Sequence, residues 1–104
     1  MTFAAYHEFC MSLPGTEETF PFDATTLVFK VGGKMYVLAD VESFDSLNLK
    51  WPPEVNLERR EEYPGSVLPG YHMSKVHWST VKLDGRVPDR ELMAWIRAAY
   101  EAAR

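Results

Sequence analysis

The sequence predicts an α+β fold with two layers, in which an antiparallel β-sheet carries about three helices on one face. Apolar residues recur at three- and four-residue steps near both ends of the chain, a spacing typical of amphipathic helices. Between them, a Gly-Gly pair separates two β-prone runs, which is a hairpin signal. The expected element order is α-β-β-β-α-β-β-α, and strands that follow one another in sequence tend to pair antiparallel.

The first helix is expected over residues 2–12, with Thr2 as its N-cap. Its buried stripe follows the helical period and consists of Phe3, Tyr6, Cys10 and Leu13. A Pro-Gly pair directly after Leu13 ends the helix. An acidic and aromatic connector, from Glu17 to Phe22, then leads into the sheet.

The hairpin is expected to consist of Thr26–Val31 and Lys34–Asp40, joined by a two-residue turn. Its simplest register pairs Val31 with Lys34, Phe29 with Tyr36 and Leu27 with Leu38, and this set is assigned to the face that the helices cover. The opposite face then holds Val28, Lys30, Met35, Val37 and Ala39. That face is largely apolar, so it requires a cover, which could be a helix, a dimer partner or a ligand.

The second half of the chain alternates strands and helices. A strand is expected at Ser46–Lys50, followed by a charged surface helix from Pro53 to about Tyr63. A short strand near Ser66–Leu68 and a last strand at His77–Leu83 precede a final helix that Pro88 opens. The apolar stripe of this final helix consists of Leu92, Trp95, Ile96, Ala99 and Tyr100.

Length and composition favour a single globular domain spanning residues 1–104. The net charge of −4 argues against a general polyanion binder, although it does not exclude a local basic patch. The single cysteine cannot form an internal disulfide, and neither a signal peptide nor a membrane span is expected, so the sequence predicts a cytoplasmic protein without membrane contact.

The segment from Pro69 to Trp78 is rich in chemically versatile side chains. Within it, Tyr71, His72 and His77 are candidate ligand-facing residues. The two histidines are five residues apart, which in extended chain directs them to opposite faces, and no ligand spacing surrounds them. No metal and no cofactor are therefore expected, and histidines that bond to backbone groups are the simpler interpretation.

No catalytic residue is predicted, so the protein is expected not to be an enzyme. His7 and Cys10 are three residues apart on the first helix, but Cys10 belongs to the apolar stripe, where cysteine acts as a small hydrophobe. Gly32-Gly33-Lys34 lacks the spacing of a phosphate-binding loop.

A basic and aromatic set is the strongest sign of a binding function. In the last strand, alternation places Trp78 and Lys82 outward on the helix-free side. The candidate nucleic-acid contacts are Lys30, Lys34, Lys50, Lys75, Lys82 and Trp78, since lysines beside an aromatic ring suit phosphate contact and base stacking. The alternative is that the Tyr71–Lys75 loop covers the tryptophan. The lysines around it are then ordinary solvent-exposed side chains at the edge of the sheet face.

The chain resembles the MmcQ/YjbR-like family of small bacterial proteins. The resemblance rests on the order and spacing of short matches along nearly the whole chain: Cys10 with Leu13-Pro14-Gly15, Phe20-Pro21-Phe22, Val28-Phe29-Lys30-Val31, Gly33-Lys34-Met35, Leu49-Lys50, Pro69-Gly70-Tyr71-His72-Met73-Ser74-Lys75, His77-Trp78 and Val87-Pro88. Ser74 departs from the pattern, since a polar amide residue is more usual there. The resemblance implies an α+β domain of the double-wing type, for which DNA binding is the usual inferred role, and it carries over no catalytic residue.

The leading hypothesis is therefore a non-enzymatic binding domain that contacts DNA through the hairpin wing and the last-strand surface. The alternative is a protein-interaction module or a homodimer that uses the apolar second face of the sheet. An enzyme or small-ligand binder with its site around His72, Lys75, His77 and Trp78 is a third hypothesis.

Overall fold

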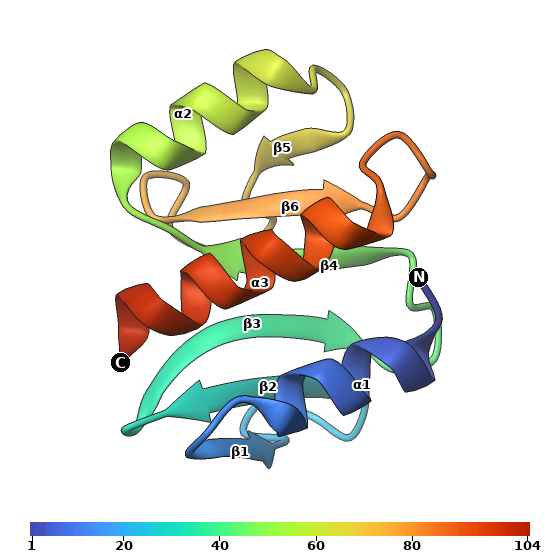
Figure 1. Ribbon diagram of the computed structural model, residues 1–104, viewed down its shortest axis with the longest axis vertical. Coiled ribbons are helices and arrows are strands. Elements are labelled where there is room, and N and C mark those ends of the chain that lie inside the picture. Colours follow the sequence, from blue (N-terminus) through green and yellow to red (C-terminus); the bar gives the residue numbers. More distant parts are fainter.

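The computed structural model describes all 104 residues and contains one six-stranded antiparallel sheet with three helices on one face (Figure 1). The strand order across the sheet is β1-β2-β3-β4-β6-β5. Along the chain, the elements are α1 (Phe3–Ser12), β1 (Thr16–Thr19), β2 (Thr26–Val31), β3 (Lys34–Asp40), β4 (Ser46–Lys50), α2 (Pro53–Glu62), β5 (Val67–Pro69), β6 (Trp78–Lys82) and α3 (Asp89–Ala103). The predicted fold class is confirmed.

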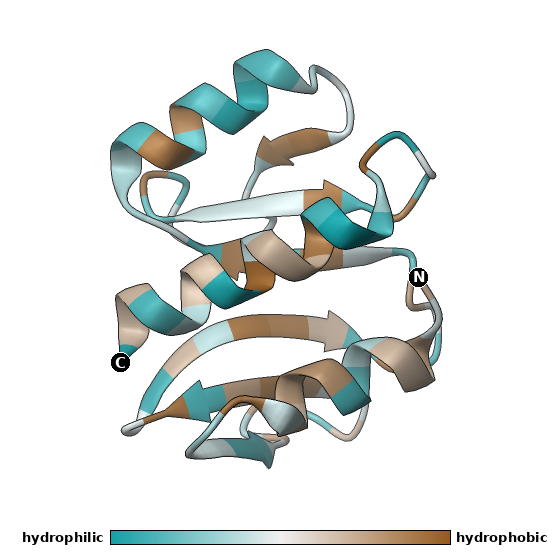
Figure 2. Ribbon diagram, viewed as in Figure 1, coloured by the Kyte–Doolittle hydropathy of each residue, from teal (hydrophilic) through white to brown (hydrophobic).

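The core lies between the sheet and the helices. Helix α3 crosses the centre of the sheet over β3 and β4, α1 lies over the β1–β2 side, and α2 lies beside β5 and β6 (Figure 1). Figure 2 shows that apolar residues are concentrated in β2 and β3, whereas α2 is mostly hydrophilic. Thr2 caps α1 as predicted, since its hydroxyl oxygen accepts a hydrogen bond from the Ala5 N–H at 3.1 Å. None of the helices combines the length and the apolar character needed to cross a membrane.

The sequence pattern predicts a connector after Gly15, but the structure has strand β1 there. Thr16–Thr19 pairs antiparallel with β2, placing Thr16 opposite Val31 and Glu18 opposite Phe29. The sequence Thr-Glu-Glu-Thr has no apolar alternation to indicate a strand. Its two glutamates suit an edge, because charges on an edge strand discourage pairing with another chain.

The predicted hairpin register is correct at the turn and wrong beyond it. Val31 lies opposite Lys34 and Lys30 opposite Met35, as the predicted register requires. The register then shifts so that Phe29 pairs with Val37, which leaves Tyr36 as the extra residue of a β-bulge. A shift of one residue exchanges the two faces of a strand. Leu38 therefore lies on the helix-free face, whereas Val37 and Ala39 join the main core beneath the helices.

The cover of the helix-free face is part of the chain itself. Trp78, Val28 and Leu38 form a small second core, against which Met35 and Met73 pack. Met73 belongs to the loop of residues 70–77, which is called the covering loop below. The apolar face that suggested a homodimer or a protein partner is thus covered without one.

Polar side chains of α2 hold the covering loop in place. The Arg60 guanidinium donates to the Lys75 carbonyl at 2.6 Å and to the Trp78 carbonyl at 2.8 Å. The buried Asn56 amide donates to the Val76 carbonyl at 3.1 Å. The helix that the sequence marks as a charged surface element therefore also fixes the loop on which several candidate residues lie.

Candidate functional site

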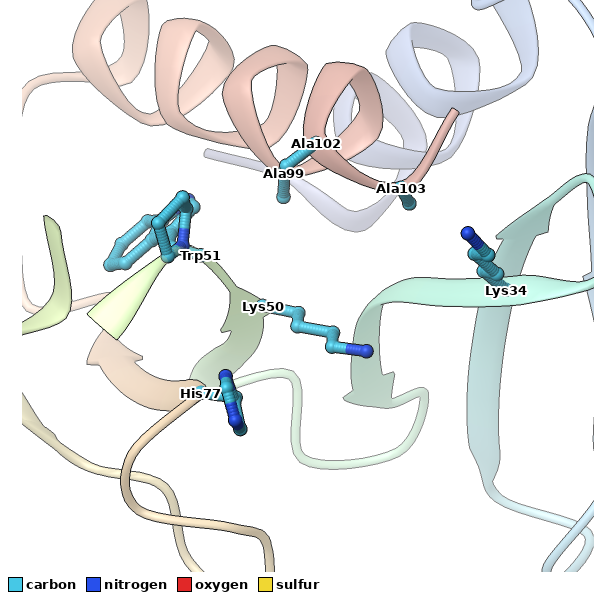
Figure 3. Close-up of a pocket in the computed structure, with 8 residues that line it drawn as sticks. Lys34, Lys50, Trp51, His77, Ala99, Ala102 and Ala103 are labelled. Atoms are coloured by element: carbon cyan, nitrogen blue, oxygen red, sulfur yellow. The ribbon is translucent and has the colours of Figure 1, made fainter. Parts of the chain in front are cut away.

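The first candidate site is a hollow of about 280 Å³ beside the last turn of α3. Lys34, Lys50 and His77 line it, and these three residues are called the basic corner below. Figure 3 shows Lys50 extending from the end of β4 toward the side of Lys34, with His77 next to Lys50. The rest of the lining is Trp51, Pro52, Ala99, Ala102 and Ala103.

Three separate parts of the chain build the basic corner. Lys34 begins β3 directly after the turn, where Gly32 and Gly33 adopt positive φ angles of 57° and 80°. Lys50 ends β4, and the Trp51 N–H next to it donates to the His77 carbonyl at 3.0 Å. This backbone bond places His77 beside Lys50. No carboxylate side chain lines the hollow, so the lysines give it a local positive charge although the whole chain is acidic.

The other predicted lysines do not join this corner. Lys30 lies across from Glu17 in the β1–β2 pairing, and Lys82 lines a separate depression with Asp45 and Asp84. Lys75 donates through its ammonium group to the Gly70 carbonyl at 3.1 Å. The predicted basic surface is therefore dispersed, and two of its five lysines converge.

Trp78 does lie on the helix-free face, but it is not available for base stacking. Its side chain is only 5% exposed, because it packs beneath the covering loop with Val28 and Leu38. The loop comes so close that a Cβ atom added to Gly70 would lie 2.8 Å from the Trp78 Cβ. The alternative interpretation of Trp78, as a residue covered by this loop, is the one that the structure shows.

Tyr71 and His72 line a second and larger hollow, of about 590 Å³, on the helix-free side. This hollow is called the acidic groove below. The sheet contributes Thr26, Leu38, Asp40, Ser46 and Asn48 to its lining. Loop residues complete it, namely Phe22, Asp23, Ser43, Tyr71, His72 and Met73. The three candidate ligand-facing residues therefore divide between two hollows, since His77 lies in the basic corner.

His7 and Cys10 do not form a nucleophilic pair. The His7 ring faces Glu18, with Nε2 2.8 Å from Oε2, while Cys10 is buried in the main core. Burial raises the pKa of the Cys10 thiol to about 12, so the reactive thiolate is absent at neutral pH. Nowhere do three histidine, cysteine or acidic side chains lie together in a way that could hold a metal ion.

Sequence reasoning missed the alanines that line the hollow at the basic corner and the carboxylates of the acidic groove. Ala99, Ala102 and Ala103 are spaced as one face of α3, but nothing local shows that this face ends beside Lys34 and Lys50. Asp23 has a clearer signal, because an aspartate shortly before Thr25 and Thr26 is typical of a turn in which the side chain accepts backbone hydrogen bonds.

Comparisons with known proteins agree on one family. The family model YjbR matches residues 11–102. The protein YjbR of Escherichia coli (strain K12) is 33% identical over 104 residues, which covers 99% of this chain and 87% of that protein. The protein YbdF of Escherichia coli O157:H7 is 40% identical over 72 residues, covering 68% of this chain and 58% of that protein.

Solved structures share the fold. The crystal structure of Deinococcus radiodurans protein DR2400, with a DUF419 domain, has a TM-score of 0.88 at 45% sequence identity, covering 95% of this chain and 75% of that chain. A crystal structure from Pseudomonas syringae, structural genomics target PsR293, has a TM-score of 0.81 at 24% identity with both chains fully covered, and this likeness concerns the fold alone. None of these names states an activity.

Proposed function

The chain belongs to the YjbR family, and we propose that it is a non-enzymatic, cytoplasmic domain that binds DNA through the basic corner. The observation that carries this proposal is the convergence of Lys34, Lys50 and His77 on one hollow without a carboxylate. Phosphate contacts by basic side chains supply most of the affinity in sequence-independent DNA binding. The basic corner is thus the part of the surface where the backbone of DNA fits best.

The shape of the basic corner favours a phosphate that is attached to a sugar. Two lysines and a histidine line the hollow, and the remaining lining residues are alanine, proline and tryptophan, which are called its apolar floor below. A free phosphate would contact the basic groups but leave this apolar floor in water. A nucleotide unit of DNA can place its phosphate on Lys34 and Lys50 and its deoxyribose against the floor.

The rest of the molecule limits the footprint. Trp78 is buried, and the carboxylates Asp23 and Asp40 line the groove on the helix-free side, where they repel a polyanion. DNA therefore approaches the hairpin tip and the end of β4, not the whole sheet face. Two or three phosphate contacts predict weak, sequence-independent binding.

The test is a titration of a short labelled duplex by fluorescence anisotropy at several salt concentrations. The logarithm of the binding constant should fall against the logarithm of the salt concentration with a slope of about −2 to −3, as expected for two or three neutralised phosphates. Replacing Lys34 and Lys50 together by alanine should abolish measurable binding. Lys82→Ala removes the same kind of charge elsewhere and should leave most of the affinity intact.

Two outcomes would reject the proposal. One is the absence of binding at the lowest salt concentration. The other is a Lys34→Ala/Lys50→Ala variant that binds DNA as tightly as the unmodified protein. Inorganic phosphate is titrated separately as a control. If phosphate binds the basic corner with saturation while DNA does not bind, the basic corner is a site for small phosphates and not for DNA.

A further inference from the structure

The acidic groove is a second candidate site, distinct from the DNA contact. It lies on the helix-free side beside Ser46 and Asn48, whereas the basic corner adjoins Lys50 at the other end of β4. Its volume of about 590 Å³ falls within the usual range for small-molecule sites. The basic corner and the acidic groove therefore have opposite charge and lie at opposite ends of one strand.

Two large aromatic side chains lie at the groove and remain in contact with water. Phe22 is 61% exposed and Tyr71 is 70% exposed, and neither belongs to a core cluster. The Tyr71 ring lies against the His72 ring, with centroids 4.0 Å apart. The face of an aromatic ring attracts cations, because the π-electrons carry negative charge there.

Asp23 and Asp40 give the groove its negative charge. Asp23 Oδ1 accepts hydrogen bonds from the Thr25 and Thr26 N–H groups at 2.9 and 2.7 Å. Asp40 Oδ1 accepts from the Glu42 and Ser43 N–H groups at 2.8 and 3.1 Å. These backbone donors lower the pKa of both carboxyl groups, so both are ionised at neutral pH.

Neither carboxylate has a cationic partner. The ion pairs of the chain use Glu18, Asp89 and Glu101 instead, and no lysine or arginine lines the groove. The Thr25 hydroxyl lies between the two carboxylates, 3.3 Å from Asp23 Oδ1 and 3.4 Å from Asp40 Oδ2. Two negative charges on either side of one hydroxyl repel each other, and a bound cation would relieve that repulsion.

We propose that the acidic groove binds a small organic cation that carries an amidinium, guanidinium or ammonium group on a flat apolar body. The charged group interacts with Asp23 and Asp40, and the body packs against Phe22 and Tyr71. A bare metal ion fits less well, since no three histidine, cysteine or acidic side chains lie close enough together to hold one, and a metal ion would make no use of the aromatic walls.

The test compares three probes of nearly equal size by NMR titration of the ¹⁵N-labelled protein. Benzamidine carries the positive charge, benzamide is neutral and benzoate is negative. Benzamidine should shift the amide signals of Phe22, Asn48 and Tyr71 with saturation, whereas benzamide should bind more weakly and benzoate not at all.

Variants separate the contribution of charge from that of fold. Asn retains a side-chain oxygen that can accept the backbone hydrogen bonds, so Asp23→Asn/Asp40→Asn removes charge while the loops keep their turns. Benzamidine should bind this variant about fivefold to tenfold more weakly, since an exposed charge pair contributes a factor of a few for each carboxylate. Tyr71→Ala tests the aromatic wall and should also weaken binding, whereas Lys34→Ala/Lys50→Ala should have no effect.

The proposal fails if benzamide binds as tightly as benzamidine, or if the Asp23→Asn/Asp40→Asn variant keeps its full affinity for benzamidine. It also fails if a lysine-rich peptide shifts the groove signals while benzamidine does not, because the occupant would then be a protein segment. The DNA titration is unaffected by any of these results, since it measures the basic corner.

Discussion

At the residue scale, a buried side chain amide connects elements that are distant in the sequence. The Asn56 amide donates to the carbonyls of Trp51 and Val76 at 2.9 and 3.1 Å, and its oxygen accepts from the Ser79 hydroxyl at 2.6 Å. Asn56 is the one fully buried residue of α2. It therefore joins the start of the helix, the end of the covering loop and strand β6.

Replacing Asn56 by alanine should lower the free energy of unfolding by about 2–4 kcal/mol, because the buried Trp51 carbonyl would lose a donor and the Ser79 O–H would lose its acceptor. Urea unfolding measures this loss. Leu57→Ala is the matched control: Leu57 follows directly on the same helix but is 63% exposed, so its truncation should change stability by less than about 0.5 kcal/mol. Equal losses for both variants would contradict the role assigned to Asn56.

At the element scale, the covering loop decides what the helix-free face can do. It buries Trp78, supplies Tyr71 and His72 to the acidic groove and ends at His77 of the basic corner. Its close approach to β6 depends on Gly70, whose N–H donates to the Trp78 carbonyl at 2.9 Å. A side chain at position 70 has no room there.

Gly70→Ala should lift the covering loop from β6, because its Cβ would lie 2.8 Å from the Trp78 Cβ and 2.9 Å from the Trp78 carbonyl oxygen. Amide hydrogen exchange should become faster at Gly70, whose N–H donates to the Trp78 carbonyl, and at Trp78, whose N–H donates to the Ser74 carbonyl. Ser74→Ala is a suitable control, since Ser74 lies exposed in the same loop. Unchanged exchange in the Gly70 variant would show that the contact is not required.

Helices α1 and α3 and strand β4 follow from periodicity and from local signals at their ends, and the structure confirms them. Strand β1 could not be predicted because its sequence is polar and its pairing with β2 is its only reason to be extended. The bulge at Tyr36 leaves no local signal, since it depends on how two strands pair.

At the scale of the whole molecule, a buried polar cluster lies inside the main core. Tyr6, Cys10 and Tyr36 are all fully buried. Burial is the main cause that raises the pKa of each group, and the Tyr6 hydroxyl has no hydrogen-bond partner. All three groups are therefore neutral in the folded protein at pH values where the unfolded chain ionises.

The protein should lose stability as the pH rises above about 8.5, where an unfolded cysteine begins to ionise, and lose it faster above about 10, where unfolded tyrosines follow. Each group that is neutral when folded and charged when unfolded lowers the free energy of unfolding by about 1.4 kcal/mol per pH unit. The contribution of Cys10 is fully present below the unfolded pKa and is lost as the pH approaches the folded value of about 12.

Urea unfolding across this pH range tests the prediction. Cys10→Ala should remove the part of the decline that begins near pH 8.5, whereas Tyr71→Phe, which changes an exposed tyrosine, should leave the profile unchanged. A stability that stays constant up to about pH 11 would show that the cluster is hydrated or rearranges.

The fold class, the three helices and most of the strands can be predicted from the sequence alone, because these depend on periodicity, capping residues and turns within short stretches of chain. The sequence also names every basic residue of the site. The folded chain brings Lys34, Lys50 and His77 to one hollow, keeps Lys30, Lys75 and Lys82 away from it, and covers Trp78. The sequence does not show these outcomes, because they depend on strand pairing, on a bulge and on the path of one loop, all of which are set by contacts between residues far apart in the chain.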